Sequence, residues 1–464
     1  MNVAMYDARE ICAQNVEKLV RWAVSIEVPD IPDAVMQKAA RVLADDLAAM
    51  IGARDEPQVA RFHQRVIERS RPAEATIWRG GAARTDRVSA AVANAVAADW
   101  LELDEGYRPA PCHAGLYVLP ALLAEAEVSG LRISEVLRAL VLGYEIVTRI
   151  ARSWTPKALT MQAHGRYAAV GAAAGIGLAL RLSHDELVSA LGGAVTLIGP
   201  APRNHLEEGV LIRNAWPASG AFNGMMSVEL ANCGINGVAG AFYDVYSTVL
   251  GGQEHPDRLL DHLSESWAVL DGYTKIYACC QHLHSAVEAA ISLRAKHAEL
   301  VNAGEIEAVT VQCHPLALAF SNAAPETSLG AKFSMPHAVA AALVLGEAGA
   351  AAFGAQVLAD QNITALRMRV EMVHWVASLL PPNDRPARIV VAMKNGNKFS
   401  AECLSAQGGP DRPLPEDIWR EKMQSLAAPV YPLIVGVFEE IVLGDANRLD
   451  QRWADTVREI TRQP

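Results

Sequence analysis

Segments of small apolar residues at helical spacing fill the first half of the chain, and this pattern constrains the fold more than any other feature. Alanine is abundant in these segments, favours helix and lets helices pack closely. Apolar residues recur every three or four positions in residues 35–50, 88–101, 115–126, 133–148, 165–180 and 184–197. Gly171, Gly175 and Gly177 lie inside one such segment and not after a strand, which indicates helix packing and not a dinucleotide-binding loop. We therefore expect the first 250 residues to be mostly helical.

The pattern changes after Gly251. Residues 309–313 and 367–373 are predicted strands, and residues 387–393 and 398–403 form a predicted hairpin around Asn395-Gly396-Asn397. Helical spacing returns at residues 416–426 and 433–442. The predicted fold is mainly α with an inserted α+β domain. Its helical domain would comprise residues 1–269 and 405–464, and its α+β lid domain residues 270–404.

Charge and hydropathy narrow the range of functions. The net charge of −11 and the absence of any run of Lys or Arg argue against nucleic acid and anionic membranes as partners. The longest uncharged apolar run, Tyr167 to Leu180, is shorter than the roughly 20 residues that span a bilayer. The N-terminus lacks the pattern of a signal peptide, and seven cysteines without CxxC spacing are typical of reduced thiols. We expect a cytoplasmic protein without a membrane segment.

Four of the thirteen histidines stand where small-residue helices are predicted to begin: His113, His164, His284 and His337. A helix N-terminus offers unpaired N–H groups and partial positive charge, so an imidazole there is pushed toward its neutral form beside an anion-binding surface. If these helix starts converge, they predict an active site for a small anionic substrate. The alternative for each histidine taken singly is a buried side chain with satisfied hydrogen bonds.

The stretch WLELDEGYRPAPCH, residues 100–113, places Glu102, Asp104 and Glu105 shortly before His113. A carboxylate beside a histidine fixes its tautomer and raises its basicity, which prepares it for general acid–base catalysis. The competing interpretation is a solvated acidic helix end followed by a polar cap.

Three cations are candidate ligands for substrate carboxylates. Arg203 and Arg213 could each bind a carboxylate as a fork, although pairing with Glu207 or Glu208 is the more common outcome. Lys275 opens the string KIYACCQHLH, whose Cys279, Cys280, His282 and His284 also permit a metal-site interpretation. Adjacent cysteines rarely close on one ion, so Lys275 as a point charge and His284 as a helix cap fit better.

The order of four motifs resembles that of the MmgE/PrpD family. They are LELDEG with the histidine that follows it, a histidine before a small-residue helix, KIYACCQHLH and FSMPHAVA. The resemblance spans nearly the whole chain. It implies a helical domain made from both chain ends, an inserted α+β lid, a homodimer, and a site between the domains that needs no metal or organic cofactor. It also implies proton removal next to a carboxylate of a small di- or tricarboxylate, followed by loss of water, loss of carbon dioxide or return of a proton.

By position, the family's acidic motif falls on residues 102–106, its histidines on His113 and His164, and its lid lysine on Lys275. His337 stands where relatives often have tyrosine. Glu102 replaces an aspartate, Gly106 replaces a threonine, and Arg213 stands in the run that often holds a lysine. These departures bear on the substrate more than on the fold, so methylcitrate or aconitate is not assumed.

These observations predict a cofactor-independent, dehydratase-like lyase. His113, His164 and His337 would transfer protons, Asp104 or Glu102 would orient His113, and Lys275 and Arg213 would bind substrate carboxylates, with Arg203 and His284 as further candidates. An epimerase or isomerase of an amino- or imino-dicarboxylate and a decarboxylase remain alternatives. A metal-dependent hydrolase and a non-catalytic helical dimer are more distant ones.

Overall fold

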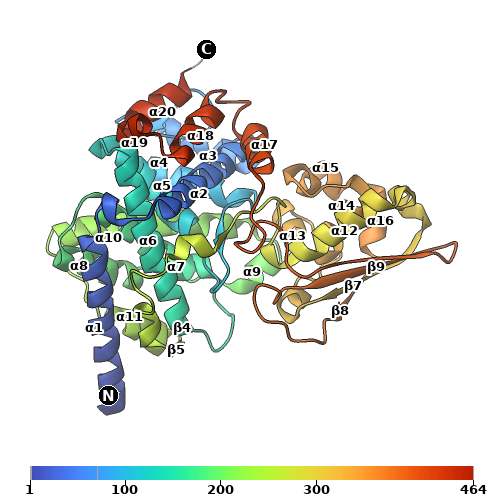
Figure 1. Ribbon diagram of the computed structural model, residues 1–464, viewed down its shortest axis with the longest axis horizontal. Coiled ribbons are helices and arrows are strands. Elements are labelled where there is room, and N and C mark those ends of the chain that lie inside the picture. The colour runs from blue at the N-terminus through green and yellow to red at the C-terminus, as the bar shows by residue number, and fades with distance from the viewer. Residues whose placement is uncertain (1–2, 70–71, 463–464) are drawn as a thin grey trace.

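A computed structural model of the chain describes residues 3–69 and 72–462. Long helices dominate its first half, with short strands only in the connections (Figure 1). The long helices are α1 (Val3–Ser25), α2 (Asp33–Gly52), α3 (Pro57–Glu68), α4 (Arg87–Trp100), α5 (Ala114–Ser129), α6 (Ile133–Ser153), α7 (Ala163–Ala179), α8 (His184–Thr196) and α10 (Trp216–Asn232). Each helical segment predicted from the apolar spacing is a helix here, with ends that differ by a few residues.

Helix α7 lies among α5, α6, α8 and α10. Its small residues permit this close packing: a Cβ at Gly171 would stand 2.7 Å from the Cβ of Tyr117 on α5, and one at Gly175 2.8 Å from Val118. On α10, Gly220 and Gly224 face Ala168 and Ala172 of α7 in the same way. The predicted packing role of the α7 glycines is confirmed.

The second part of the chain carries one four-stranded sheet in the order β10-β9-β7-β8. Its strands are β7 (Ile306–Cys313), β8 (Val370–His374), β9 (Ala387–Met393) and β10 (Lys398–Cys403); β7 pairs parallel with β8 and antiparallel with β9. The predicted hairpin of β9 and β10 is confirmed, and Gly396 has the positive φ of 90° that its turn requires. Helix α12 (His284–Lys296) packs on β9 and β10, and α14 (Met335–Leu345) and α16 (Gln361–Arg367) lie beyond it (Figure 1).

The predicted strand 367–373 begins too early. Helix α16, whose first turn Asp360 caps by accepting a hydrogen bond from the Ile363 N–H, includes Arg367, and β8 starts only at Val370.

The last helices, α17 (Glu416–Leu426), α18 (Ile434–Leu443), α19 (Ala446–Asp450) and α20 (Trp453–Thr461), return to the helical part (Figure 1). Helices α17 and α18 pack on α2, and α20 packs on α5. A mainly α protein with some β structure is thus confirmed, while the expected domain boundaries stay a prediction. Within residues 3–69 and 72–462, no helix is both long and apolar enough to cross a membrane.

Candidate active site

A two-residue strand pair brings the acidic loop beside the lysine predicted to bind substrate. Strand β3 (Gly106–Tyr107) pairs antiparallel with β6 (Gly272–Tyr273), so the segment that leads to Lys275 runs along the loop of Glu102 and Asp104. The ring of Tyr273 lies where a side chain at residue 106 would begin. A larger residue at position 106 would require this ring to move, so glycine in the acidic motif fits the position of Tyr273.

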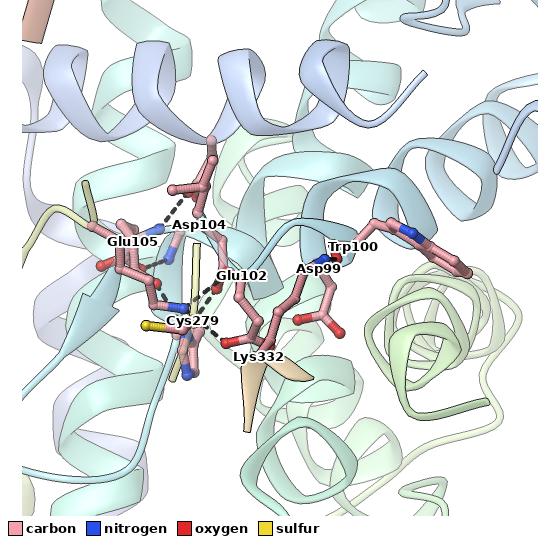
Figure 2. Close-up of polar contacts among 12 residues, drawn as sticks. Asp99, Trp100, Glu102, Asp104, Glu105, Cys279 and Lys332 are labelled. Carbon is pink, nitrogen blue, oxygen red and sulfur yellow. Dashed lines mark hydrogen bonds and ion pairs between the residues drawn. The ribbon is translucent and has the colours of Figure 1, made fainter. Parts of the chain in front are cut away.

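Lys275 is buried and binds two carboxylates of that loop. Its Nζ lies 3.1 Å from Glu102 Oε2 and 3.2 Å from Asp104 Oδ1. The other carboxylate oxygen of Glu102 pairs with Arg213 Nη1 at 2.5 Å. Glu102 has a φ of 55°, an uncommon backbone conformation for a residue other than glycine. Figure 2 shows how Asp99, Glu102, Asp104 and Glu105 follow one another along this stretch.

His113 forms the N-cap of α5, and its Nδ1 lies 2.7 Å from Asp104 Oδ2. Burial lowers the pKa of an imidazole, but the Asp104 carboxylate outweighs burial here, so the pKa of His113 lies above its ordinary value. Burial alone would raise the pKa of Asp104, yet Lys275 and His113 hold it below the usual range. With Nδ1 engaged, the Nε2 atom is the ring nitrogen left for substrate.

His164 lies in the first turn of α7, and its ring centroid is 5.1 Å from that of His113. Its Nε2 lies 3.2 Å from Asp99 Oδ1, and its Nδ1 lies 2.9 Å from the Tyr117 hydroxyl. Burial lowers the pKa of His164, and the nearby Arg213 acts in the same direction against Asp99. Two adjacent imidazoles thus have pKa values shifted in opposite directions, as is typical of an acid–base pair.

A cavity of about 320 Å³ opens beside these residues. Its wall includes five residues predicted for the site, namely Glu102, His113, Arg203, Arg213 and Lys275. Arg203 Nε pairs with Glu207 at 3.2 Å, the partner that the sequence suggested, whereas Arg213 pairs with Asp99 and Glu102. The volume suits a small organic acid.

Of the four histidines, His113 lines this cavity and His164 contacts its ring from behind the wall, whereas the other two lie apart from the cavity. His337 is buried in α14, where its Nε2 lies 3.0 Å from the Ala352 carbonyl and its Nδ1 faces Arg367 at 3.4 Å. His284 is buried behind Lys275, with its Nε2 3.1 Å from the Cys279 carbonyl. The structure therefore corrects the expected convergence of all four: His337 is not placed to transfer protons in this cavity, and His284 is not placed to contact substrate there.

The two histidines outside the cavity have lowered pKa values. Burial is the principal cause in both remote histidines, and it lowers the pKa of His284 to about 3 and that of His337 to about 4. Both rings are therefore neutral for the reason that applies to many core histidines.

The metal-site interpretation of KIYACCQHLH finds no ligand cluster. Within the described part of the chain, no group of three or more His, Cys, Asp or Glu is arranged to hold a metal ion. His282 stacks on Phe320 and lines the cavity, whereas His284 points to a backbone carbonyl.

Sequence reasoning did not identify three buried polar residues beside these candidates. Asp99 is buried between His164 and Arg213, and Tyr117 contacts His164 from α5. Lys332 is also buried, where burial lowers its pKa to about 8, and it donates a hydrogen bond to the Trp100 carbonyl at 2.6 Å (Figure 2). Asp99 lies three residues before Glu102, which is about one helical turn. The available signal was therefore a further acidic residue one turn before the acidic motif.

The fold and this cluster of buried acids, histidines and cations are those of an enzyme site, and comparison with protein families gives its class. The MmgE/PrpD N-terminal domain matches residues 17–251, and the MmgE/PrpD C-terminal domain matches residues 277–437. The chain belongs to the MmgE/PrpD family and is an enzyme of that type.

Curated relatives share moderate identity with the chain. The cis-aconitate decarboxylase-like protein oryM of Aspergillus oryzae is 27% identical over 439 residues, which cover 89% of this chain and 90% of that protein. The cis-aconitate decarboxylase of Aspergillus terreus is 28% identical over 303 residues, 61% of each chain. The family resemblance predicted from the motifs is confirmed.

Proposed function

We propose that this enzyme is a lyase that acts on a small di- or tricarboxylate, and that His113 transfers a proton at the carbon next to a substrate carboxylate. The observation that carries this proposal is the pair of His113 and Asp104 at a cavity whose wall is rich in cations. The pair supplies a positioned proton-transfer group, and the cations compensate the charge of the acid.

In the dehydration that we propose first, neutral His113 takes a proton through Nε2 from the carbon next to a carboxylate. The electron pair of the broken C–H bond forms a C=C bond as the C–O bond on the neighbouring carbon breaks, and the leaving hydroxide takes a proton from solvent in the cavity to become water. The negative charge that develops on the carboxylate lies near Lys275 and Arg213. Lys275 has three N–H donors and uses two of them for Glu102 and Asp104, which leaves one for substrate.

We assign His164 and Asp99 a supporting role in the same step. His164 packs against His113 behind the cavity wall, with its Nδ1 at the Tyr117 hydroxyl and its Nε2 facing the Asp99 carboxylate, which can only accept a proton. A neutral ring at this place holds His113 in position without adding a further charge.

Decarboxylation is the second candidate, and it is favoured by the similarity to the Aspergillus proteins that are named cis-aconitate decarboxylase or cis-aconitate decarboxylase-like. In that reaction the C–C bond to a carboxylate breaks, its electron pair stays on carbon, and protonated His113 supplies the proton. An isomerase that returns the proton to the same carbon would use the same groups. The expected independence from metal and organic cofactor also belongs to this proposal.

The experiment is proton–deuterium exchange in deuterated water across a panel of small carboxylic acids, followed by NMR. The panel contains hydroxy-dicarboxylates and tricarboxylates, unsaturated tricarboxylates and amino-dicarboxylates, each with untreated and chelator-treated enzyme. We expect washout of the proton next to a carboxylate, or product formation with one deuteron gained, in at least one member. A panel without exchange or product would overturn the proposal, and activity lost to the chelator would overturn its cofactor independence.

A further inference from the structure

The cavity wall carries a second group of cations, distinct from Lys275 and Arg213. They are Arg108, which follows β3, Arg166 in the first turn of α7, Arg203 at the start of α9 (Arg203–Glu207), and Arg385, which precedes β9. They come from both the helical part and the part that carries the sheet.

The inner cations are already neutralised by the protein. Arg213 and Lys275 together pair with three carboxylates, those of Asp99, Glu102 and Asp104. Protonated His113 adds one positive charge and makes this cluster neutral. Its charges can orient one substrate carboxylate, but they provide no surplus for a second.

The outer cations have fewer partners. Arg108 and Arg385 share Asp384, at 2.6 and 3.7 Å, and Arg203 pairs with Glu207. Four guanidinium groups therefore meet two carboxylates, which leaves two positive charges at this end of the cavity. A second anionic group of the substrate is best placed here.

Of these four arginines, Arg166 alone has no carboxylate within ion-pair distance in residues 3–69 and 72–462. It is 8% exposed and lines the cavity, and its Nε has no hydrogen-bond partner in the same part of the chain. Its neighbour is the neutral phenol of Tyr167. A buried guanidinium without an anion is costly, so its place is explained if a ligand supplies the anion.

We propose that Arg166 binds the substrate carboxylate that is remote from the reacting carbon, and that it thereby selects dicarboxylates over monocarboxylates. This inference rests on the proposed function for the identity of the reacting end. It adds the residue that recognises the other end. A planar guanidinium can bind that carboxylate through two parallel N–H donors, whereas the ammonium of a lysine cannot.

Binding of unreactive acids tests the inference without any turnover. Glutarate and pentanoate have the same chain length and differ in one carboxylate, and their dissociation constants can be measured by titration calorimetry on the wild-type protein and on Arg166→Gln. We expect wild type to bind glutarate about ten- to a hundred-fold more tightly than pentanoate, the range of one charge-assisted hydrogen-bonded pair. In Arg166→Gln this preference should vanish while pentanoate affinity stays the same. Equal affinities in wild type, including no binding of either acid, would overturn the inference.

Kinetics on the true substrate provide the second test. Arg166→Gln should raise KM far more than it lowers kcat. The KM of Arg166→Lys should lie between the values of Arg166→Gln and wild type. Arg388→Gln, on the exposed side of β9, is the control and should change neither KM nor kcat. If Arg166→Gln does not fold, the Arg166→Lys comparison decides alone, since a wild-type KM and glutarate preference in that variant contradict a bidentate contact. A protein that prefers glutarate through Arg166 yet exchanges no proton would refute the proposed function and keep this inference, whereas turnover with an unchanged KM in Arg166→Gln would do the reverse.

Discussion

One carboxylate determines the charge of the residue that we assign to proton transfer. Asp104 lies 2.7 Å from His113 and raises the pKa of this ring against the effect of burial, while the adjacent His164 keeps a lowered pKa. The ordinary pKa of histidine is 6.5. The titration of His113 therefore falls above that value, and its protonated and neutral forms suit different reactions.

The pH profile of kcat/KM separates these reactions. Dehydration needs neutral His113 as the base, so the rate should rise with pH through the raised pKa, with its midpoint above 6.5. Decarboxylation needs the protonated ring as the proton donor, so the rate should fall through the same pKa. The measurement is kcat/KM between pH 5.5 and 9.5 at constant ionic strength, and His113→Gln should lose about 10²- to 10⁴-fold in rate. A profile without a limb in this range, or a His113→Gln enzyme with wild-type rates, would rule out His113 as the proton-transfer group.

The sequence predicted the chemistry of this site better than it predicted which residues form the site. His113, Asp104 and Glu102 lie close together in the chain, so their contact could be expected from the motif. His337 begins a helix of the same composition as the others, but its helix packs elsewhere, and composition does not encode where a helix packs. Arg166 was not identified because its importance depends on which charges lack partners, a property of the folded arrangement. Asp99 had a signal in its place just before the acidic motif, but its pairing with His164 and Arg213 is visible only in the fold.

At the scale of elements, the contact between α7 and α10 determines how the helical part packs. Gly220 on α10 faces the backbone of α7, where an added Cβ would lie 2.8 Å from the Ala168 carbonyl carbon and 2.9 Å from the Ala169 nitrogen. Backbone atoms cannot move aside as the end of a side chain can. The close approach of these helices also fixes the start of α7, which carries His164 and Arg166.

We predict opposite effects for two glycine-to-alanine changes in neighbouring helices. Gly220→Ala should reduce the free energy of unfolding by about 1–3 kcal/mol because the added methyl group forces the two helices apart. Gly193→Ala on α8 should increase it by about 0.4–1 kcal/mol, since its nearest neighbour is Ser227 at an ordinary 3.7 Å and alanine lowers the entropy of the unfolded chain. Urea unfolding followed by circular dichroism measures both values. Equal stability of the two variants would contradict the packing argument.

Elements were more predictable than their arrangement. Residues 416–426 were predicted as a helix that follows Pro413 and Pro415, and α17 has those bounds. Strand β8 was predicted to start three residues early because Arg367 belongs to the end of α16, a boundary that the apolar pattern does not show. The pairing of β3 with β6, which brings Lys275 to Asp104, joins two dipeptides far apart in sequence and had no signal in the pattern.

At the scale of the whole molecule, the helical part has an apolar surface outside the catalytic cavity. Phe222 and Met226, one turn apart on α10, are 44% and 39% exposed. They line a groove together with Leu180 at the end of α7. Exposed apolar groups gathered in this way are typical of a surface that binds another protein. The homodimer expected from the family resemblance stays a prediction, and this groove is the surface that we assign to it.

Charge at this surface tests the assignment. In a twofold dimer each substitution occurs twice in one interface, so Phe222→Glu and Met226→Glu should place like charges opposite each other or bury them without partners. Light scattering after size exclusion should then give a mass near the 49.7 kDa of one chain for both variants, and twice that mass for wild type. Val376→Glu, at a site 84% exposed in the part that carries the sheet, is the matched control and should keep the wild-type mass. A monomeric wild type would remove the dimer itself, whereas dimeric Phe222→Glu and Met226→Glu proteins would move its interface to another face. Because the groove lies outside the catalytic cavity, monomeric variants that keep full kcat would show that each chain forms a complete site.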